Sequence, residues 1–198
     1  MNFEGILEMN PGPERTAALV GWFQGLFEDR SAAPVLVGGA AVELYTGGAY
    51  LTGDLDFVGY MTEEVARSLS EVGFRRTGRH WKHEEGQLFI EIPGSFLEGG
   101  ARSAELDAFG EVLRVISPED ALVDRLAGWK FWKSHEHGVN AYLLYRALGE
   151  DLDISRLEER ARTEHVLDAW NEVVQFAKEI KGREATEGEL REWAKRNL

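Results

Sequence analysis

The sequence predicts an α+β protein in which residues 1–116 form a mixed sheet flanked by helices and residues 117–198 form a helical C-terminal region. Two observations predict this division. Strand patterns alternate with helix patterns along the first part, and only helix patterns follow it. The chain has 198 residues, of which 43% are hydrophobic, so it can bury one good-sized core or a compact domain with a smaller companion.

The first elements are a helix, a short strand and a second helix. Apolar residues recur at three- and four-residue spacing over residues 13–27, which predicts an amphipathic helix. A short buried strand is expected at residues 35–37, after Pro34. Gly38 and Gly39 end this strand, and residues 40–45 are predicted to be a helix packed close to it.

A strand with two carboxylates follows at residues 54–58. Acidic and apolar residues alternate strictly there, and successive side chains of a strand point to opposite faces. Asp54 and Asp56 therefore share one face, whereas Leu55 and Phe57 share the other.

The other predicted elements are shorter strands and a series of helices. Thr62 is expected to cap a helix that runs to Val72, with acidic residues in its first turn. The strand predicted at residues 87–92 places Glu91 on the face opposite Leu88 and Ile90. The remaining expected strands are residues 79–82, 104–109 and 112–116, and the expected helices are residues 118–133, 137–148, 154–163, 164–180 and 186–196.

The charge of the chain limits its partners. There are 35 acidic and 22 basic residues, and the net charge of −13 repels a phosphate backbone, so we expect no extended nucleic-acid surface. A small triphosphate that brings its own metal ions is compatible with this charge, because a metal reverses the local field. Cysteine is absent, which excludes disulfides, a thiolate nucleophile and cysteine-ligated zinc.

The sequence also predicts a cytoplasmic protein with no membrane partner. No apolar run approaches the roughly 18 residues that a membrane span needs. The segment Met1 to Pro11 lacks the basic start and apolar centre of a signal peptide.

The glycine pair and the aspartate pair together indicate a candidate site. Two acids at this spacing are by themselves a weak signal, because they are common on solvated strand faces. The context strengthens it, because a strand that turns into a helix through Gly38 and Gly39 lets backbone N–H groups approach an anion without a Cβ in the way. The alternative interpretation of the glycines is an ordinary tight strand–helix junction that needs a positive φ.

This arrangement resembles a known family. Gly38-Gly39 opening a helix, followed by Thr52-Gly53-Asp54-Leu55-Asp56-Phe57-Val58, resembles the signature of minimal nucleotidyltransferases of the polymerase-beta-type superfamily. The closest resemblance in style is to bacterial abortive-infection, toxin-type nucleotidyltransferases of unknown substrate. Residues 116–126 resemble the helix that opens the C-terminal part of those proteins. The resemblance extends from Pro34 to Trp132, half of the chain.

The resemblance implies a nucleotidyltransferase-type sheet and a nucleotide site. Gly38 and Gly39 are expected to contact a nucleoside triphosphate, and Thr52 and Arg125 to belong to the same nucleotide-binding set. Asp54 and Asp56 are expected to bind two Mg²⁺ ions, because magnesium prefers hard oxygen ligands.

The resemblance further implies that Glu91 is the third carboxylate, a metal ligand that activates the acceptor hydroxyl. Asp107, on the next predicted strand, is the rival for this role.

The sequence departs from the family at three positions. Ala40 replaces a serine or threonine after the glycines, Glu91 stands where aspartate is more common, and Arg125 replaces a lysine. Arg125 is also expected to pair with Asp124 or Asp120 on its own helix.

The predicted function is metal-dependent transfer of a nucleoside monophosphate from an NTP, such as ATP, to a hydroxyl acceptor. An RNA end, a small molecule and a protein side chain are the three acceptor classes, and the acidic surface disfavours long RNA. The main alternative is a catalytically degenerate module that binds a nucleotide or a partner protein, as in a toxin–antitoxin pair. A phosphohydrolase is a third hypothesis, but the histidine–aspartate pairs usual for such sites are missing.

Overall fold

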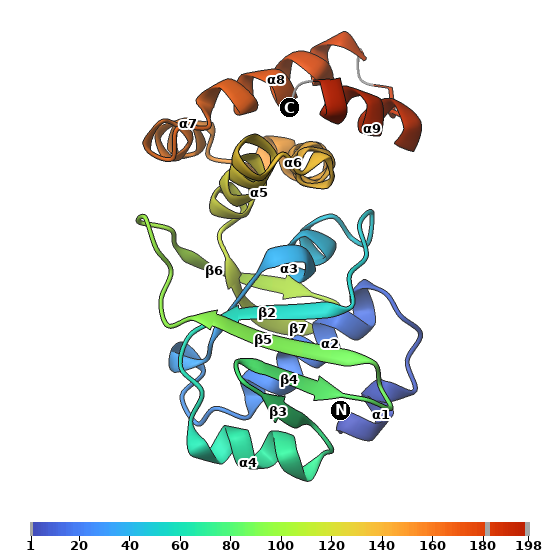
Figure 1. Ribbon diagram of the computed structural model, residues 1–198, viewed down its shortest axis with the longest axis vertical. Helices are drawn as coiled ribbons and strands as arrows, with labels where there is room; N and C mark the ends of the chain where they lie inside the picture. The colour runs from blue at the N-terminus through green and yellow to red at the C-terminus, as the bar shows by residue number, and fades with distance from the viewer. Residues whose placement is uncertain (1, 181–182, 197–198) are drawn as a thin grey trace. The chain divides into compact units, whose positions relative to one another are not determined.

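The computed structural model describes residues 2–180 and 183–196. It divides the chain into two compact units, Met1–Ser117 and Pro118–Leu198 (Figure 1). The first unit contains the sheet, and the second contains only helices and a short 3₁₀ turn among its described residues. No helix in the described part of the chain is long and apolar enough to cross a bilayer.

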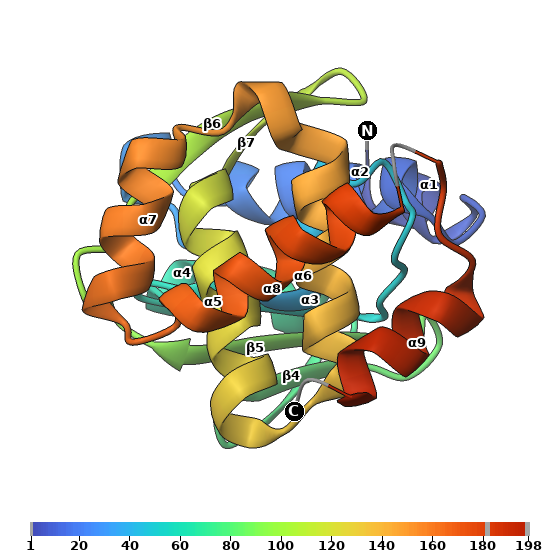
Figure 2. The ribbon, with the colours of Figure 1, turned by 90° about the horizontal axis from the view of Figure 1, so that it is seen from above.

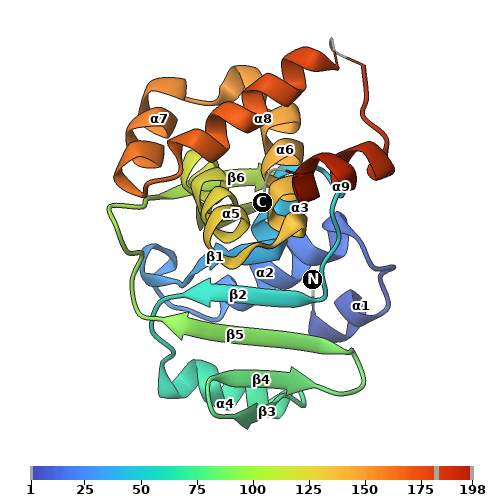
Figure 3. The same ribbon diagram turned by 45° about the horizontal axis from the view of Figure 1, so that its top comes forward.

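The first unit is built around a mixed sheet whose described strands run in the order β3-β4-β5-β2-β1-β7-β6. Strand β2 pairs antiparallel with β1 and parallel with β5, so it lies in the middle of the sheet (Figure 3). The strands are β1 (Val35–Val37), β2 (Asp54–Val58), β3 (Arg75–Thr77), β4 (His80–His83), β5 (Leu88–Gly94), β6 (Ser103–Ala108) and β7 (Glu111–Ile116).

One face of this sheet forms the core of the first unit. Phe57 is fully buried on it, and its ring lies 4.5 Å from that of Phe23 on the covering helix α2. Because side chains alternate along a strand, the other face of β2 carries Asp54 and Asp56. The helices of this unit are α1 (Phe3–Leu7), α2 (Pro13–Gly25), α3 (Gly38–Tyr45) and α4 (Glu63–Glu71).

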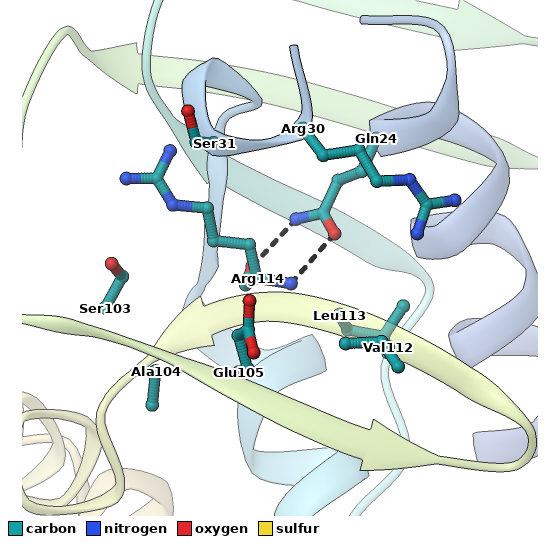
Figure 4. A pocket seen from close by; sticks show the side chains of 9 residues that line it. All are labelled: Gln24, Arg30, Ser31, Ser103, Ala104, Glu105, Val112, Leu113 and Arg114. Carbon is teal, nitrogen blue, oxygen red and sulfur yellow. Dashed lines mark hydrogen bonds between the residues drawn. The ribbon is translucent and has the colours of Figure 1, made fainter.

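A buried amide fixes the strand that leads into the glycine turn. Gln24 of α2 is only 4% exposed, and its Nε2 donates to the carbonyls of Pro34 at 2.9 Å and Arg114 at 2.7 Å. Its Oε1 accepts the Arg114 N–H at 2.9 Å, as Figure 4 shows. Arg114 Nη1 in turn donates to the Ala33 carbonyl at 2.6 Å. These bonds hold β7 and the start of β1 against α2.

The second unit packs around its first two helices. Helix α5 contacts α6, α7 and α8, while α6 also contacts α9, and Figure 2 shows α8 running across α5 and α6. Trp129 is buried and donates from Nε1 to the Ala194 carbonyl at 2.9 Å, which ties α5 to α9. The helices are α5 (Pro118–Trp132), α6 (His135–Leu148), α7 (Ile154–Thr163), α8 (Leu167–Glu179) and α9 (Glu187–Arg196).

The differences from the sequence prediction include three with a clear physical reason. Helix α1 was not predicted, because its five residues are too few to show a period. Strand β3 was not predicted either, because all its side chains are exposed and only pairing with β4 defines it. The helix expected to start at residue 164 begins at Leu167 instead, because His165 has a φ of +58° that no helix accepts.

Candidate functional site

The glycine turn joins β1 directly to the first turn of α3. Gly38 has a φ of +68°, which an L-residue with a Cβ rarely adopts. A Cβ at Gly38 would also lie 2.3 Å from Asp56 Oδ2, and one at Gly39 would lie 3.2 Å from Thr52 Oγ1. Glycine at position 38 is therefore required by both the backbone conformation and the close approach of Asp56.

The residue at the N-cap of α3 provides no side-chain cap. Val37 occupies the cap position and makes no side-chain hydrogen bond to the first turn. The first N–H groups of a helix have no partner within the helix and carry the positive end of its dipole. This turn therefore presents N–H groups suited to an anion, close to Asp56.

The structure brings Glu91 next to the aspartate pair. In the parallel pairing of β2 with β5, Asp54 lies beside Phe89 and Asp56 lies beside Glu91. Leu55 and Ile90, which are also neighbours, are buried on the opposite face. The three predicted carboxylates thus share one face of two adjacent strands.

Glu91 already has two partners in the structure. Arg79 Nε lies 2.7 Å from its Oε1, and His80 Nδ1 lies 3.4 Å from its Oε2. His80 comes from β4, where it is the register partner of Glu91. Among residues 2–180 and 183–196, no three histidine or acidic side chains form a group that could hold a metal. Glu91 is therefore near the aspartates but is not gathered with them into one cluster.

The other predicted site residues have defined contacts. Thr52 Oγ1 accepts the Asp54 N–H at 3.3 Å and lies against Gly39, so it belongs to the glycine turn. Arg125, in the second unit, is largely buried and donates from Nε to Asp124 Oδ2 at 3.0 Å. Asp120 pairs instead with Arg156 and Arg160.

Asp107, the rival third carboxylate, lies at the far edge of the sheet. It is on β6, which β1 and β7 separate from β2. Three strand spacings of about 4.8 Å place β6 about 14 Å from β2. Within the sheet, Glu91 is therefore the acid that neighbours Asp56, and Asp107 is not.

A cavity of about 380 Å³ lies beside Asp54, within the first unit. Phe89, which is 38% exposed, forms part of its wall, and Lys82 Nζ lies 5.4 Å from the centre of the Phe89 ring. Lys82 is also paired with Glu84 at 2.9 Å. The cavity is lined by Gly53, Asp54, Lys82, Glu84, Gln87 and Phe89.

Sequence reasoning did not identify two contributors to this site, Arg79 and Glu43. Arg79 precedes β4, and only the β4–β5 pairing brings it to Glu91. Glu43 accepts the Thr52 N–H from within α3. A signal for Glu43 was present, because it is the one charged residue of the otherwise apolar segment from Ala40 to Tyr45, which indicates burial.

The comparison with known proteins bears on the fold. Neither the protein-family models nor the curated proteins give a match to the chain. The crystal structure of an antigenic nucleotidyltransferase-like protein from Paracoccidioides brasiliensis is similar, with a TM-score of 0.58 and 14% identity over 83% of this chain and 89% of that one.

The solution structure of the antibiotic-resistance factor ANT(2'')-Ia is also similar. Its TM-score is 0.50, with 16% identity over 83% of this chain and 95% of that one. At identities this low, structural similarity shows the fold alone. The mixed sheet with flanking helices, followed by a helical C-terminal region, agrees with the predicted fold class. The chain has the nucleotidyltransferase fold.

Proposed function

We propose that the protein transfers a nucleoside monophosphate from an NTP to a hydroxyl acceptor, with pyrophosphate as the leaving group, in a magnesium-dependent reaction. The observation that carries this proposal is the N-terminus of α3, whose cap residue Val37 makes no side-chain hydrogen bond and which lies against Asp56 at a glycine that no larger residue can replace without strain. Backbone N–H groups for phosphate and carboxylates for a cation thus occur side by side.

The aspartates fit magnesium by their chemistry. Asp54 and Asp56 present hard oxygen atoms on one face of β2, and magnesium is commonly held by one or two carboxylates together with substrate phosphates. When bound, the metal neutralises negative charge on the triphosphate. Gly38 and Gly39 hold the phosphates through their N–H groups, and Thr52 keeps the Asp54 segment beside them.

Glu91 is assigned to the acceptor. It neighbours Asp56 on the next strand, so it can orient or deprotonate a hydroxyl that approaches the phosphate held at the turn. The cavity beside Asp54, which is lined from β2, β4 and β5, provides room for an acceptor on the same face of the sheet. The acidic net charge of −13 favours a small molecule or a protein side chain over a long RNA.

A second candidate function is nucleotide or partner binding without turnover. Two observations favour it: Glu91 is engaged by Arg79 and His80, and Ala40 provides no hydroxyl at the phosphate turn. The resemblance to toxin-type proteins suggests a partner protein in a toxin–antitoxin pair for this function.

Titration calorimetry with each NTP, with magnesium and then with EDTA, tests the proposal. We expect binding only with magnesium, because the carboxylates otherwise repel a triphosphate. Incubation with NTP labelled at the α-phosphate, magnesium and a cell extract then identifies the acceptor by its label.

The outcomes separate the two functions. Label transfer supports the enzyme. Magnesium-dependent binding with no labelled product from any NTP favours the binding module, and equal affinity in EDTA contradicts the metal-dependent site.

A further inference from the structure

The loop that leads from α3 into β2 is held by one buried carboxylate, Glu43. Its side chain is 1% exposed. Oε2 accepts the Thr52 N–H at 3.1 Å, and Oε1 accepts the hydroxyl of Thr16 at 3.1 Å. The backbone carbonyl of Glu43 also accepts the Gly48 N–H, at 2.9 Å. Glu43 therefore holds this loop at both of its ends.

The far end of the loop is part of the candidate site. Thr52 accepts the N–H of Asp54 through Oγ1, and a Cβ at Gly39 would lie 3.2 Å from the same oxygen. Tyr50 approaches Gly39 as well, since a Cβ there would lie 3.3 Å from Tyr50 Cε1. The bond to Glu43 therefore holds a residue that itself contacts both Asp54 and Gly39.

The burial of Glu43 is costly. Among the described residues, no lysine, arginine or histidine forms an ion pair with it, and burying a carboxylate without a counter-ion is unfavourable. A glutamine can make the same two contacts, with its oxygen toward Thr52 and its N–H₂ toward the Thr16 oxygen. This position therefore requires two hydrogen-bonding groups that orient the loop, and it does not require a negative charge.

We propose that Glu43 is a positioning residue that holds Thr52 and Asp54 against the Gly38–Gly39 turn and so sets the geometry of the nucleotide site. The second half of this inference rests on the proposed function. The first half concerns the loop alone and can be tested without a nucleotide.

Amide hydrogen exchange tests the loop. In the unmodified protein, the Thr52 amide should exchange as slowly as the amides of β2, although it lies in a loop. Glu43→Leu should speed exchange at Thr52 by about tenfold, because one buried hydrogen bond is lost. Glu43→Gln should restore it to within about twofold, because the amide keeps both contacts.

Glu119→Leu is the matched control, because it also removes a buried glutamate that accepts a backbone N–H, that of Asp153 at 3.1 Å, but Glu119 lies in the second unit. It should lower the melting temperature and leave the exchange of Thr52 unchanged. Equal acceleration at Thr52 in Glu43→Leu and Glu119→Leu would overturn the proposal. So would exchange of the Thr52 amide at exposed-loop rates in the unmodified protein, a result that does not require any variant to fold.

Titration of Mg·ATP tests the second half. Glu43→Leu should weaken affinity by about tenfold or more, because a small displacement of a ligand group is enough to disturb binding. Glu43→Gln should rescue the affinity, and Glu119→Leu should not weaken it. If the unmodified protein binds no nucleotide while the exchange results hold, the proposed function fails and the role of Glu43 in placing Asp54 stands. Unchanged affinity in Glu43→Leu would overturn its role at the site.

Discussion

The two halves of the candidate site differ in what holds them in place. The Gly38 corner, made of Gly38, Gly39, Asp54 and Asp56, is set by backbone conformation and by contacts too close for any residue but glycine. The Glu91 corner, made of Glu91, Arg79 and His80, is set by side chains. Arg79 in that corner is 61% exposed.

This difference indicates different roles. A backbone turn keeps its shape with or without a ligand, so the Gly38 corner needs no rearrangement to receive the magnesium–triphosphate complex that we propose as its ligand. An exposed ion pair contributes little to stability and exchanges partners easily, so the Glu91 corner can rearrange when an acceptor or metal arrives. Variants that alter one corner and leave the other intact test this difference.

The largest effect is expected from Asp56→Asn. Asp56 lies between the glycine turn and Glu91, so loss of its charge should weaken Mg·NTP binding and lower transfer on the order of a thousandfold. Calorimetric titration measures the binding, and label transfer measures the reaction rate. Asp107→Asn, an exposed acid at the far edge of the sheet, is the control and should change neither. Normal transfer by Asp56→Asn would remove the basis of the site.

Gly38→Ala should damage the same corner through the backbone. The φ of +68° and the approach of Asp56 together predict a loss of roughly 3 kcal/mol in the free energy of unfolding, with loss of nucleotide binding. Urea denaturation measures the first effect. Gly78→Ala separates the causes, because Gly78 has a φ of +63° but open space around it. It should cost only about 1 to 2 kcal/mol. Equal costs would mean that the close approach contributes nothing.

Glu91→Gln should separate chemistry from binding. If Glu91 serves only the acceptor hydroxyl and the catalytic metal, turnover should fall about a hundredfold while nucleotide affinity hardly changes. The protein should stay folded, because Glu91 is partly exposed. Steady-state kinetics measures turnover, and calorimetry measures nucleotide affinity. Unchanged turnover would favour the binding module.

The two corners also differ in how well the sequence predicts them. The strict alternation of residues 54–58 is enough to place Asp54 and Asp56 on one face, and two adjacent glycines after a strand are enough to predict a positive φ. Both signals are local. The same is true of most helix ends, where caps and breakers lie within a few residues of the boundary.

The contacts of the Glu91 corner are not local. Glu91 meets His80 because β4 and β5 pair in one register out of several, and Arg79 follows from that register. Glu43 meets Thr52 because α3 turns one particular side toward the loop. The strand register and the side of a helix that faces a loop depend on how the elements pack. A single sequence therefore predicts which acids belong to the site but not which residues contact them.

The buried Glu43, which bonds Thr52 beside the Gly38 corner, predicts that the stability of the protein depends on pH. Burial raises the pKa of Glu43 above its ordinary value, and the hydrogen bonds from Thr52 and Thr16 offset this only in part. The folded state therefore favours the protonated form. Its stabilising effect is complete below the ordinary value of 4.5 and is lost as the pH rises through the raised pKa.

Unfolding of the unmodified protein and of Glu43→Gln across this pH range measures the effect. The stability of the unmodified protein relative to the variant should fall from pH 4.5 upward, because glutamine does not titrate. A constant difference between the two proteins would show that Glu43 titrates alike in the folded and unfolded states.

The smallest effect is expected from Arg79→Ala in the Glu91 corner. The pair with Glu91 is short, at 2.7 Å, but Arg79 is exposed, so its loss should change the free energy of unfolding by less than about 1 kcal/mol. If Arg79 only holds Glu91 in the resting state, it competes with the acceptor and metal for that carboxylate. Turnover should then rise by at most about fivefold, the factor that corresponds to such a pair.

Arg76→Ala provides the control for Arg79→Ala, because Arg76 is an exposed arginine of the same hairpin whose Nε donates to the Gly78 carbonyl instead of to an acid. It should leave turnover unchanged. In a Glu91→Gln background, Arg79→Ala should have no further effect, because the partner charge is gone. Added salt should reproduce the Arg79→Ala result in the unmodified protein, since it screens exposed pairs. A tenfold fall in turnover would instead mean that Arg79 itself binds the substrate, and the Glu91 corner would then be as fixed in its function as the Gly38 corner.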